Sequence, residues 1–393
     1  MSNTKVDTVT RYSPLEVVNY LHLEWKTRNS VNIVGEPSTV KSVGVEDFSK
    51  ATSEAEGRIY FPWVKRSHEE KMKVMEDPGK YFVFADFRAS ETDIGELRLQ
   101  DISSELNYLT YKYGMLFQAL STDVAMGVLF FDEMNLAPNM IKAQFYKLIN
   151  DKAIGDIPLS KNVMCVSAGN EAEHARGVTA DPVPLVLRRS NIFVRPLDHE
   201  EFSDYAIKTG HSPHIVGYLA FQPHDTHNIK YDLPDSVGQP CPRTWSRLSE
   251  VMNANEHATL EQIRMAATGW VGQAVATKFY SYVKSAQTIN LDEIIRKPEL
   301  IRRFEDDEKN ISLVYAIMSG LVDKYRQDKK KYIKPVFEVV NELRRTELGT
   351  FLFRSARSLD PKAFMKLGAD ETIVPKHLMD KLVDRYARFL IPN

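Results

Sequence analysis

A phosphate-binding motif with one unusual residue stands near the start of the chain. Residues 32–44 read NIVGEPSTVKSVG, so Lys41 and Ser42 follow Gly35 after an interval of five residues. The pattern G-x-x-x-x-G-K-[ST] is typical of a loop whose backbone amides surround phosphates, with the lysine at the outer phosphates and the hydroxyl on Mg²⁺. The second glycine of the pattern is replaced here by Val40. The predicted loop comprises Gly35, Glu36, Pro37, Ser38, Thr39, Val40, Lys41 and Ser42.

A pair of acids follows another short apolar segment. In GVLFFDEMN, four apolar residues end in Asp132 and Glu133. Two carboxylates after a buried strand are costly unless they meet a cation or a reacting water. Asp132 would then hold Mg²⁺ through water, and Glu133 would orient and activate the attacking water. The alternative is a strand that ends in a charged loop, and the acid pair taken alone favours that alternative.

Three further polar signals stand near the ends of predicted elements. Asn170 follows the apolar segment VMCVSAG, and its amide would hold the same water. Arg188 and Arg189 lie between a predicted helix and a strand in PLVLRRSNIF, and Arg243 opens a predicted helix in CPRTW. Each of these signals is ordinary when taken alone, as a turn residue or a surface arginine. Their order along the chain is the specific feature.

The elements that would position these side chains are those of a parallel sheet. Five short apolar segments alternate with helical patterns up to residue 197, and their nearly continuous apolar character suits strands covered on both faces. The predicted strands are residues 31–35, 81–87, 127–133, 163–169 and 191–197. A β-hairpin is predicted within residues 153–163, and insertions are predicted between Lys41 and Asp86 and over residues 88–104. In an open sheet of this kind, ligands bind at the carboxyl ends of the strands.

The second half of the chain and the composition complete this outline. After Pro196 the sequence has helical patterns, among them residues 242–252 with Pro242 in the first turn. The 51 basic and 53 acidic residues give a net charge of −2, which offers no general argument for a nucleic-acid or membrane partner. No segment approaches the roughly 18 apolar residues that cross a bilayer, and no signal region is evident. We expect a soluble, cytoplasmic protein of two or three domains.

The order of the motifs resembles that of an AAA+ ATPase of the MoxR branch, in the helix-2-insert clade. The resemblance extends from about Pro14 to near residue 285 and is carried by GEPSTVKS (Walker A), LFFDEMNLAP (Walker B), AIGDIPLSKNV, SAGN (sensor 1), LRRS and PRTW (sensor 2). It implies an α/β P-loop core with a five-stranded parallel sheet over residues 1–197. A helical lid over residues 198–285 and a helical C-terminal extension over residues 286–393 would follow. The insertion at residues 88–104 matches the helix-2 insert, which faces the pore in related rings.

The resemblance also implies roles for single residues. Lys41 would contact the β- and γ-phosphates of ATP, Ser42 and Asp132 would hold Mg²⁺, and Glu133 would activate water. Asn170 would act as the sensor of sensor 1. Arg189 matches the arginine finger best, although LRRS lacks the aromatic that usually follows the arginine, so the choice between Arg188 and Arg189 stays open. Arg243 would touch the γ-phosphate of its own subunit.

The loop departs from this family at residues 38 and 40, where glycines are usual and this chain has Ser38 and Val40. A β-branched residue forced into the tight curl of such a loop costs on the order of 1–3 kcal/mol. This cost corresponds to nucleotide binding weakened by about 10- to 100-fold. Because Gly35, Lys41 and Ser42 are retained, we expect a working nucleotide site of altered strength.

The leading hypothesis is an ATP-driven remodelling or chaperone-like machine that assembles as a homo-oligomeric ring, by resemblance a hexamer. The alternative is a nucleotide-gated scaffold with little or no hydrolysis, and a nucleic-acid motor is disfavoured by the nearly neutral charge. A von Willebrand factor A-domain partner is implied by the resemblance alone. Two H-x-x-H pairs, His211 with His214 and His224 with His227, could bind zinc. The apolar segment between the pairs is expected to be a packed helix, which argues against a zinc site.

Overall fold

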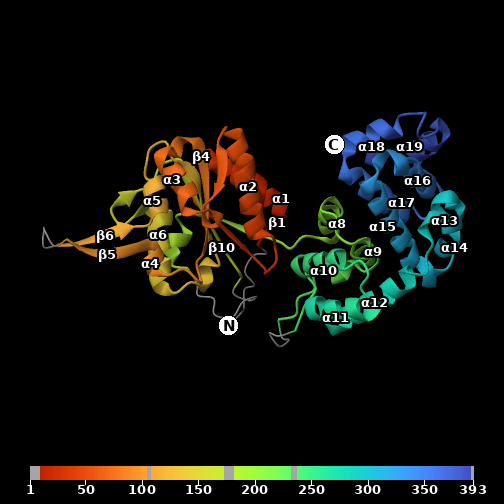
Figure 1. Ribbon diagram of the computed structural model, residues 1–393, viewed down its shortest axis with the longest axis horizontal. Helices are drawn as coiled ribbons and strands as arrows, with labels where there is room; N and C mark the ends of the chain where they lie inside the picture. Colours follow the sequence, from red (N-terminus) through yellow and green to blue (C-terminus); the bar gives the residue numbers. More distant parts are fainter. Residues whose placement is uncertain (1–8, 104–107, 172–180, 232–236, 391–393) are drawn as a thin grey trace, which may run out of the picture. The chain divides into compact units, whose positions relative to one another are not determined.

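The computed structural model describes residues 9–103, 108–171, 181–231 and 237–390. The chain divides into two compact units, Met1–Pro196 and Leu197–Asn393 (Figure 1). The first unit is built on a sheet and the second is helical. None of the described helices is long and apolar enough to cross a membrane.

The sheet of the first unit has seven strands, all parallel, in the order β1-β11-β2-β10-β7-β4-β3. The strands are β1 (Arg11–Tyr12), β2 (Val31–Gly35), β3 (Ile59–Pro62), β4 (Tyr81–Arg88), β7 (Met126–Asp132), β10 (Val163–Gly169) and β11 (Ser190–Val194). The predicted parallel α/β sheet is therefore confirmed, but the predicted number of five strands is wrong. The two additional strands are β1 and β3, the edge strands of the sheet. β1 has two exposed residues and β3 ends at a proline, so neither carries the buried apolar pattern of an inner strand.

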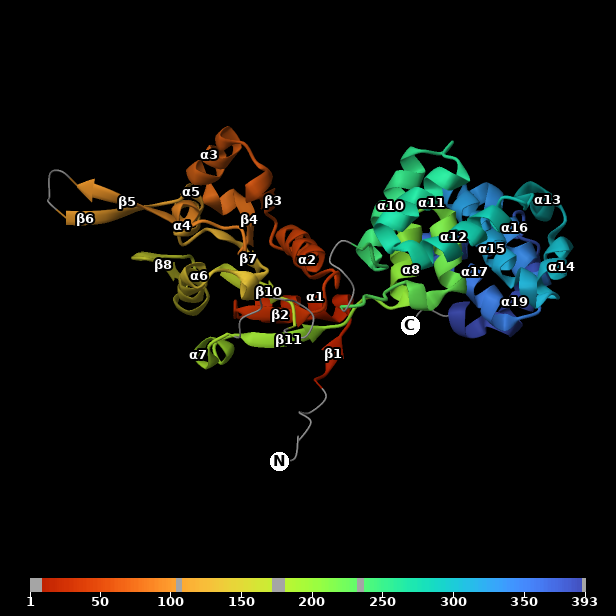
Figure 2. The same ribbon diagram turned by 90° about the horizontal axis from the view of Figure 1, so that it is seen from below.

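Helices cover both faces of the sheet, as the continuous apolar strands require. One face packs against α1 (Pro14–Trp25) and α2 (Lys41–Ala55), with Trp25 and Phe48 buried among strand residues. The other face packs against α3 (His68–Glu76), α5 (Met115–Leu120) and α6 (Asn139–Asp151). Figure 2 shows α2 and α6 on different sides of the strands. The central strands are thereby covered on both faces, and the first residues of α2 lie at the carboxyl ends of β7 and β10.

The predicted insertions and hairpin carry their own elements. Between α2 and β4 lie β3, the 3₁₀ turn η1 (Trp63–Lys65), α3 and the 3₁₀ turn η2 (Pro78–Lys80). After β4 come α4 (Ile94–Leu97) and an antiparallel hairpin of β5 (Arg98–Ser103) and β6 (Tyr108–Tyr113), which projects from the sheet in Figures 1 and 2. The last residue of the predicted insertion, Ser104, lies outside the described residues. The hairpin expected within residues 153–163 is formed by β8 (Ala153–Ile154) and β9 (Ile157–Pro158), with Gly155 at a φ of +58° in its turn.

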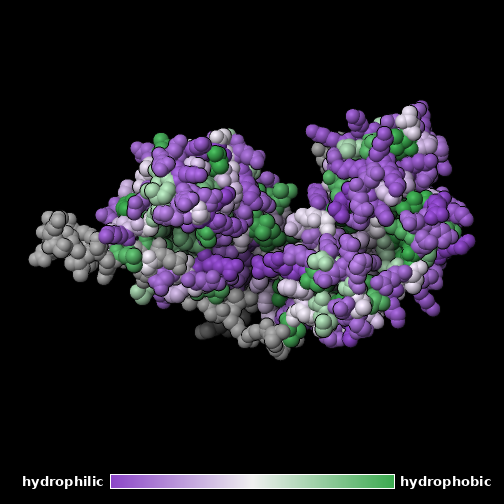
Figure 3. All heavy atoms as spheres, in the orientation of Figure 1, coloured by the Kyte–Doolittle hydropathy of each residue, from purple (hydrophilic) through white to green (hydrophobic). Residues whose placement is uncertain are grey.

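The second unit is an assembly of helices around one apolar core. That core joins residues from both sides of residue 285, for example Trp245 and Phe279 with Leu321 and Phe353. The division into a lid and a C-terminal extension at this residue stays a prediction. On the face shown in Figure 3, hydrophobic residues are scattered among hydrophilic ones in both units. The helices are α8 (His199–Lys208), α9 (Pro213–Phe221), α10 (Pro242–Ala254), α11 (Leu260–Val271), α12 (Gln273–Ala286), α13 (Leu291–Arg296), α14 (Ile301–Glu305), α15 (Ile311–Gln327), α16 (Lys329–Glu342), α17 (Thr346–Leu359), α18 (Pro361–Gly368) and α19 (Lys376–Leu390).

Candidate functional site

The loop between β2 and α2 has the curled backbone of an anion-binding turn. Ser38 has a φ of +65° and Val40 has a φ of +63° and a ψ of 19°, both in the left-handed region. These are the two positions at which glycine was expected. A β-branched residue in this region is an outlier, and it costs on the order of 1–3 kcal/mol. The loop therefore adopts the curled conformation without glycine, and the backbone of Val40 is strained.

Lys41 begins helix α2, and its ammonium group is folded back over the loop. The Nζ atom donates to the carbonyl oxygens of Gly35 at 3.0 Å and Glu36 at 2.8 Å, and to Thr39 Oγ1 at 3.2 Å. It also lies 3.1 Å from Oδ1 of Asn170, which follows β10. The lysine therefore links the loop to the end of the neighbouring strand. A helix N-terminus that carries free amides and a lysine favours an anion such as phosphate.

The hydroxyl of Ser42 donates a hydrogen bond to the carboxylate of Asp132 at the end of β7. A serine hydroxyl and a carboxylate are both oxygen ligands of the kind that Mg²⁺ takes, and here they meet directly. The residue after Asp132 is Glu133, which has a φ of +54° and whose carboxylate accepts from Ser90 Oγ at 2.6 Å. The acid pair is thus divided: Asp132 faces the phosphate loop, and Glu133 is held by a residue that follows β4.

Asn135 fixes the position of Asn170 through two hydrogen bonds. Its Nδ2 donates to the carbonyl oxygen of Asn170, and its Oδ1 accepts from the amide of Asn170 at 3.3 Å. Gly169 allows this approach, because a Cβ atom there would lie 2.9 Å from the Asn135 side chain. Buried Lys142 donates to the carbonyl oxygen of Asn135 at 2.9 Å, and burial lowers the pKa of Lys142. The turn after β7 and the end of β10 are therefore one unit.

We expect Asn135→Ala to lower the free energy of unfolding by about 1–3 kcal/mol, because it leaves both backbone groups of Asn170 without these partners. The exposed Asn139, four residues further on, provides the control: Asn139→Ala should change the value by less than about 0.5 kcal/mol. Urea unfolding followed by circular dichroism measures both. Equal values for the two variants would contradict the role given to Asn135.

The two arginines before β11 have different environments. Arg189 is buried, with 7% of its surface exposed; it forms an ion pair with Asp181 and donates to Ser167 Oγ at 3.2 Å. Ser167 belongs to β10, so Arg189 lies in the interior of its own subunit. Arg188 is exposed. Of the two arginines, Arg188 is therefore the one whose side chain is accessible at the surface of this unit.

Arg243 lies in the other unit and is the second residue of α10, with an exposed side chain. Its part in the site stays a prediction. In the first H-x-x-H pair, His211 contacts Thr209 and Ser246, both at 2.9 Å, and burial lowers the pKa of His214. Within the described ranges, no group of three or more His, Cys, Asp or Glu side chains is arranged to hold a metal ion.

Comparisons with known proteins add little to this geometry. No model of a protein family matches the sequence, and no curated protein matches it. One of the similar solved structures is a "putative ATPase" from Cytophaga hutchinsonii, with a TM-score of 0.32 and 11% sequence identity. The match covers 95% of this chain and 90% of that chain. At so low a similarity, the functional assignment has to rest on this chain's own residues.

The phosphate loop, the acid pair and Asn170 were predicted from the sequence. In the structure these residues lie together at the carboxyl ends of β2, β7 and β10. The sequence analysis did not predict that Ser90 and Asn135 belong to the site. Ser90 lies inside a polar insertion without a pattern of its own. Asn135 was visible in the segment DEMNLAP, and its place two residues after the acid pair was the only signal that could have found it.

Proposed function

We propose that the chain is a nucleotide-binding ATPase similar to the MoxR branch of AAA+ proteins, with residues 1–197 as its core. The observation that carries this proposal is the convergence of Lys41, Ser42, Asp132 and Asn170 through hydrogen bonds at one edge of a parallel sheet. Ligands of open parallel sheets bind at this edge. A lid over residues 198–285, an extension over residues 286–393 and a role for Arg243 belong to the same proposal.

Each residue of the site has a chemical task in this account. The backbone amides of Glu36 and of residues 38–42, together with the ammonium of Lys41, bind the phosphates, for which Lys41 leaves the carbonyl oxygens that it now contacts. Ser42 and Asp132 would hold Mg²⁺, which neutralises phosphate charge when it is bound. Glu133 accepts a proton from the attacking water once its carboxylate leaves Ser90, and the amide of Asn170 orients that water.

A nucleotide-gated scaffold is the second candidate, and two observations favour it. Val40 is strained, and the ammonium of Lys41 is occupied by its own loop and by Asn170. A ligand must displace these contacts before it is bound, which lowers the apparent affinity. In this version ATP changes the conformation of the loop, and the distance between Glu133 and the water stays too long for efficient hydrolysis.

We further propose a ring, by resemblance a hexamer, in which Arg188 reaches the nucleotide of the neighbouring subunit. A remodelling or chaperone-like activity and a von Willebrand factor A-domain partner follow from the same resemblance. The exposed position of Arg188 supports the choice of this residue, since Arg189 is engaged by Asp181. A role on nucleic acid is disfavoured by the net charge of −2.

Arg188→Ala is expected to lower ATP turnover by about 10³-fold, the lower end of the effect of an arginine finger. Rings that mix Arg188→Ala with Lys41→Ala subunits should recover part of the activity, because Lys41→Ala subunits supply an intact Arg188 to the intact loop of their neighbours. Phosphate release measures turnover, and size-exclusion chromatography with a slowly hydrolysed ATP analogue measures assembly. The control is Arg66→Ala, at an exposed arginine of the same unit.

Two results would speak against the ring. The natural protein would remain a monomer at high concentration with the ATP analogue bound. Alternatively, mixed rings would form and show no more activity than either variant alone, which excludes action of Arg188 on a neighbouring subunit.

A further inference from the structure

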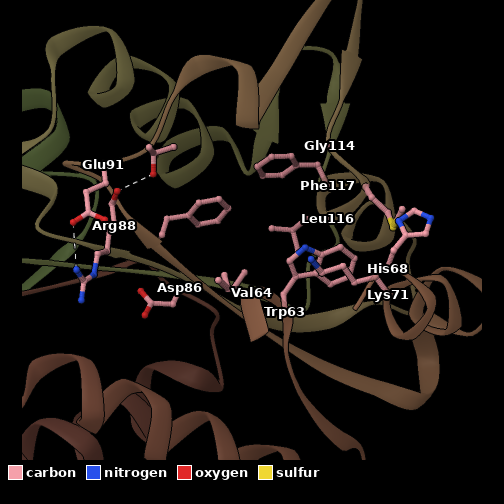
Figure 4. Close-up of a pocket in the computed structure, with 14 residues that line it drawn as sticks. Trp63, Val64, His68, Lys71, Asp86, Arg88, Glu91, Gly114, Leu116 and Phe117 are labelled. Carbon is pink, nitrogen blue, oxygen red and sulfur yellow. Dashed lines mark hydrogen bonds and ion pairs between the residues drawn. The ribbon is translucent and has the colours of Figure 1, made fainter. Parts of the chain in front are cut away.

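A pocket of about 660 Å³ lies in the first unit beside the carboxyl half of β4. Its walls come from η1, α3, β4 and the start of α5, and Figure 4 shows Trp63, Leu116 and Phe117 on one side and Asp86 on another. The volume falls within the range of about 300–1,000 Å³ that is usual for ligand sites. No residue of the phosphate loop lines this pocket, so the pocket is distinct from the phosphate loop.

The wall formed by β4 includes an uncovered edge of the sheet. β3 pairs with β4 only from Tyr81 to Phe84, because the chain turns into η1 after Pro62. On its other side β4 pairs with β7 as far as Arg88. Residues 85–88 therefore have a strand on one side, and no strand of the described sheet covers their other side. These four residues line the pocket.

Backbone groups on this edge are oriented toward the pocket. The amide of Ala89 donates to the carbonyl oxygen of Asp132 on β7 at 2.8 Å. Since residues of a parallel strand bond alternately to the two sides, the amide and carbonyl of Asp86 point away from β7. Asp86 itself is exposed. Uncovered edges of this kind bind extended peptides as additional strands.

The side chains around the edge indicate which peptide it would accept. Val64 is 64% exposed and stands beside the buried Trp63, which gives an apolar surface across from β4 (Figure 4). Arg88 is engaged by Glu91 at 3.3 Å, whereas Asp86 has no ion-pair partner in the described part of the chain. Crowding by protein atoms and then the charge of Asp132 raise the pKa of Asp86 to about 6. A cation placed here would offset the repulsion between the two carboxylates.

We propose that the uncovered edge at residues 85–88 binds an extended segment of another protein, with a basic side chain near Asp86 and apolar side chains against Val64 and Trp63. A segment of four residues spans about 13 Å at 3.3 Å per residue, the length of this edge. Side chains alternate along the added strand, so basic and apolar residues that alternate satisfy both surfaces. Backbone hydrogen bonds supply affinity, and the side chains select the sequence.

The test uses a fluorescein-labelled eight-residue peptide of alternating valine and lysine, titrated into the full-length protein without nucleotide and followed by fluorescence anisotropy. Two N-methylated versions carry methyl groups on one alternate set of amides or on the other. One of them should bind about tenfold more weakly, because the hydrogen bond to the carbonyl oxygen of Asp86 is lost, and the other should bind almost as well as the parent. A valine–glutamate peptide should bind more weakly than the valine–lysine peptide.

Val64→Trp fills the pocket from an exposed position and should abolish binding, and Asp86→Asn should remove the preference for lysine over glutamate. Val183→Trp, at a valine that is 69% exposed elsewhere in the unit, is the control and should bind like the natural protein. The proposal is overturned if the natural protein does not bind the peptide, if both methylated peptides bind equally, or if Val64→Trp binds normally. It is also overturned if Val64→Trp abolishes self-association in sedimentation, since a second copy would then be the occupant. Nucleotide is absent throughout, so failure of the ATPase proposal does not affect these outcomes.

Discussion

Replacement of Glu133 by Gln is expected to lower the turnover of ATP by about 10²–10⁴-fold while ATP stays bound. The substitution keeps the size of the side chain and its hydrogen bond with Ser90, and it removes the carboxylate that accepts the proton of the attacking water. Phosphate release at saturating ATP measures turnover, and calorimetric titration measures the dissociation constant of ATP. The dissociation constant should change by less than about threefold, because Glu133 makes no contact with the phosphate loop in the described interactions.

A glutamate outside the site separates this effect from a general loss of a carboxylate. Glu69 is exposed on α3, and Glu69→Gln should retain the turnover of the natural protein. If Glu133→Gln hydrolyses ATP as fast as Glu69→Gln, Glu133 is not the base, and the division of the acid pair between Asp132 and Glu133 has been misread.

Val40→Gly is expected to tighten ATP binding by about 10- to 100-fold. The valine holds a φ of +63°, a conformation that costs it on the order of 1–3 kcal/mol and that glycine adopts freely. Removal of this cost increases the population of the curled loop that is able to bind, and the apparent dissociation constant falls with that population. Calorimetric ATP titration of both proteins measures the change.

Ser38 gives a matched comparison, because it has the same left-handed backbone without a β-branched side chain. Ser38→Gly should therefore tighten binding by less than Val40→Gly does. Equal binding by the natural protein and Val40→Gly would show that the strain of Val40 does not control access to the site.

The same variant distinguishes the ATPase from the gated scaffold when phosphate release is measured beside binding. For a strained but working loop, the natural protein hydrolyses ATP slowly, and Val40→Gly is faster at subsaturating ATP. If the chain is a nucleotide-gated scaffold, the natural protein binds ATP without turnover. Val40→Gly then binds ATP more tightly and still releases no phosphate. We expect slow hydrolysis by the natural sequence.

The inner strands could be predicted from sequence because each is buried on both faces and therefore apolar throughout. β3 was not predicted, because it is an edge strand with the exposed Ile59 at its start and Pro62 at its end. Its formation depends on pairing with β4. The same early end of β3 exposes Asp86, a consequence of register that no local pattern contains.

In the site, the positions of residues at the predicted ends of strands indicated which of them come together. The hydrogen-bond partners of their side chains are distant in sequence and could not be predicted. Glu133 is held by Ser90, 43 residues earlier, and Asn170 is held by Asn135, 35 residues earlier. Arg189 and Arg188 are adjacent and alike in sequence. The two arginines are distinguished by the partners of Arg189, half-buried Asp181 and buried Ser167, and these partners belong to the tertiary structure.

Residues 35–42, together with Asp132 and Asn170, form the proposed nucleotide site. Its most direct test is calorimetric titration of the folded, full-length protein with ATP and Mg²⁺, compared with Lys41→Ala. We expect saturable binding of about one ATP per chain by the natural protein, weaker without Mg²⁺ and lost in Lys41→Ala. Absence of binding by the natural protein at millimolar ATP under every Mg²⁺ condition, or unchanged binding by Lys41→Ala, would contradict it.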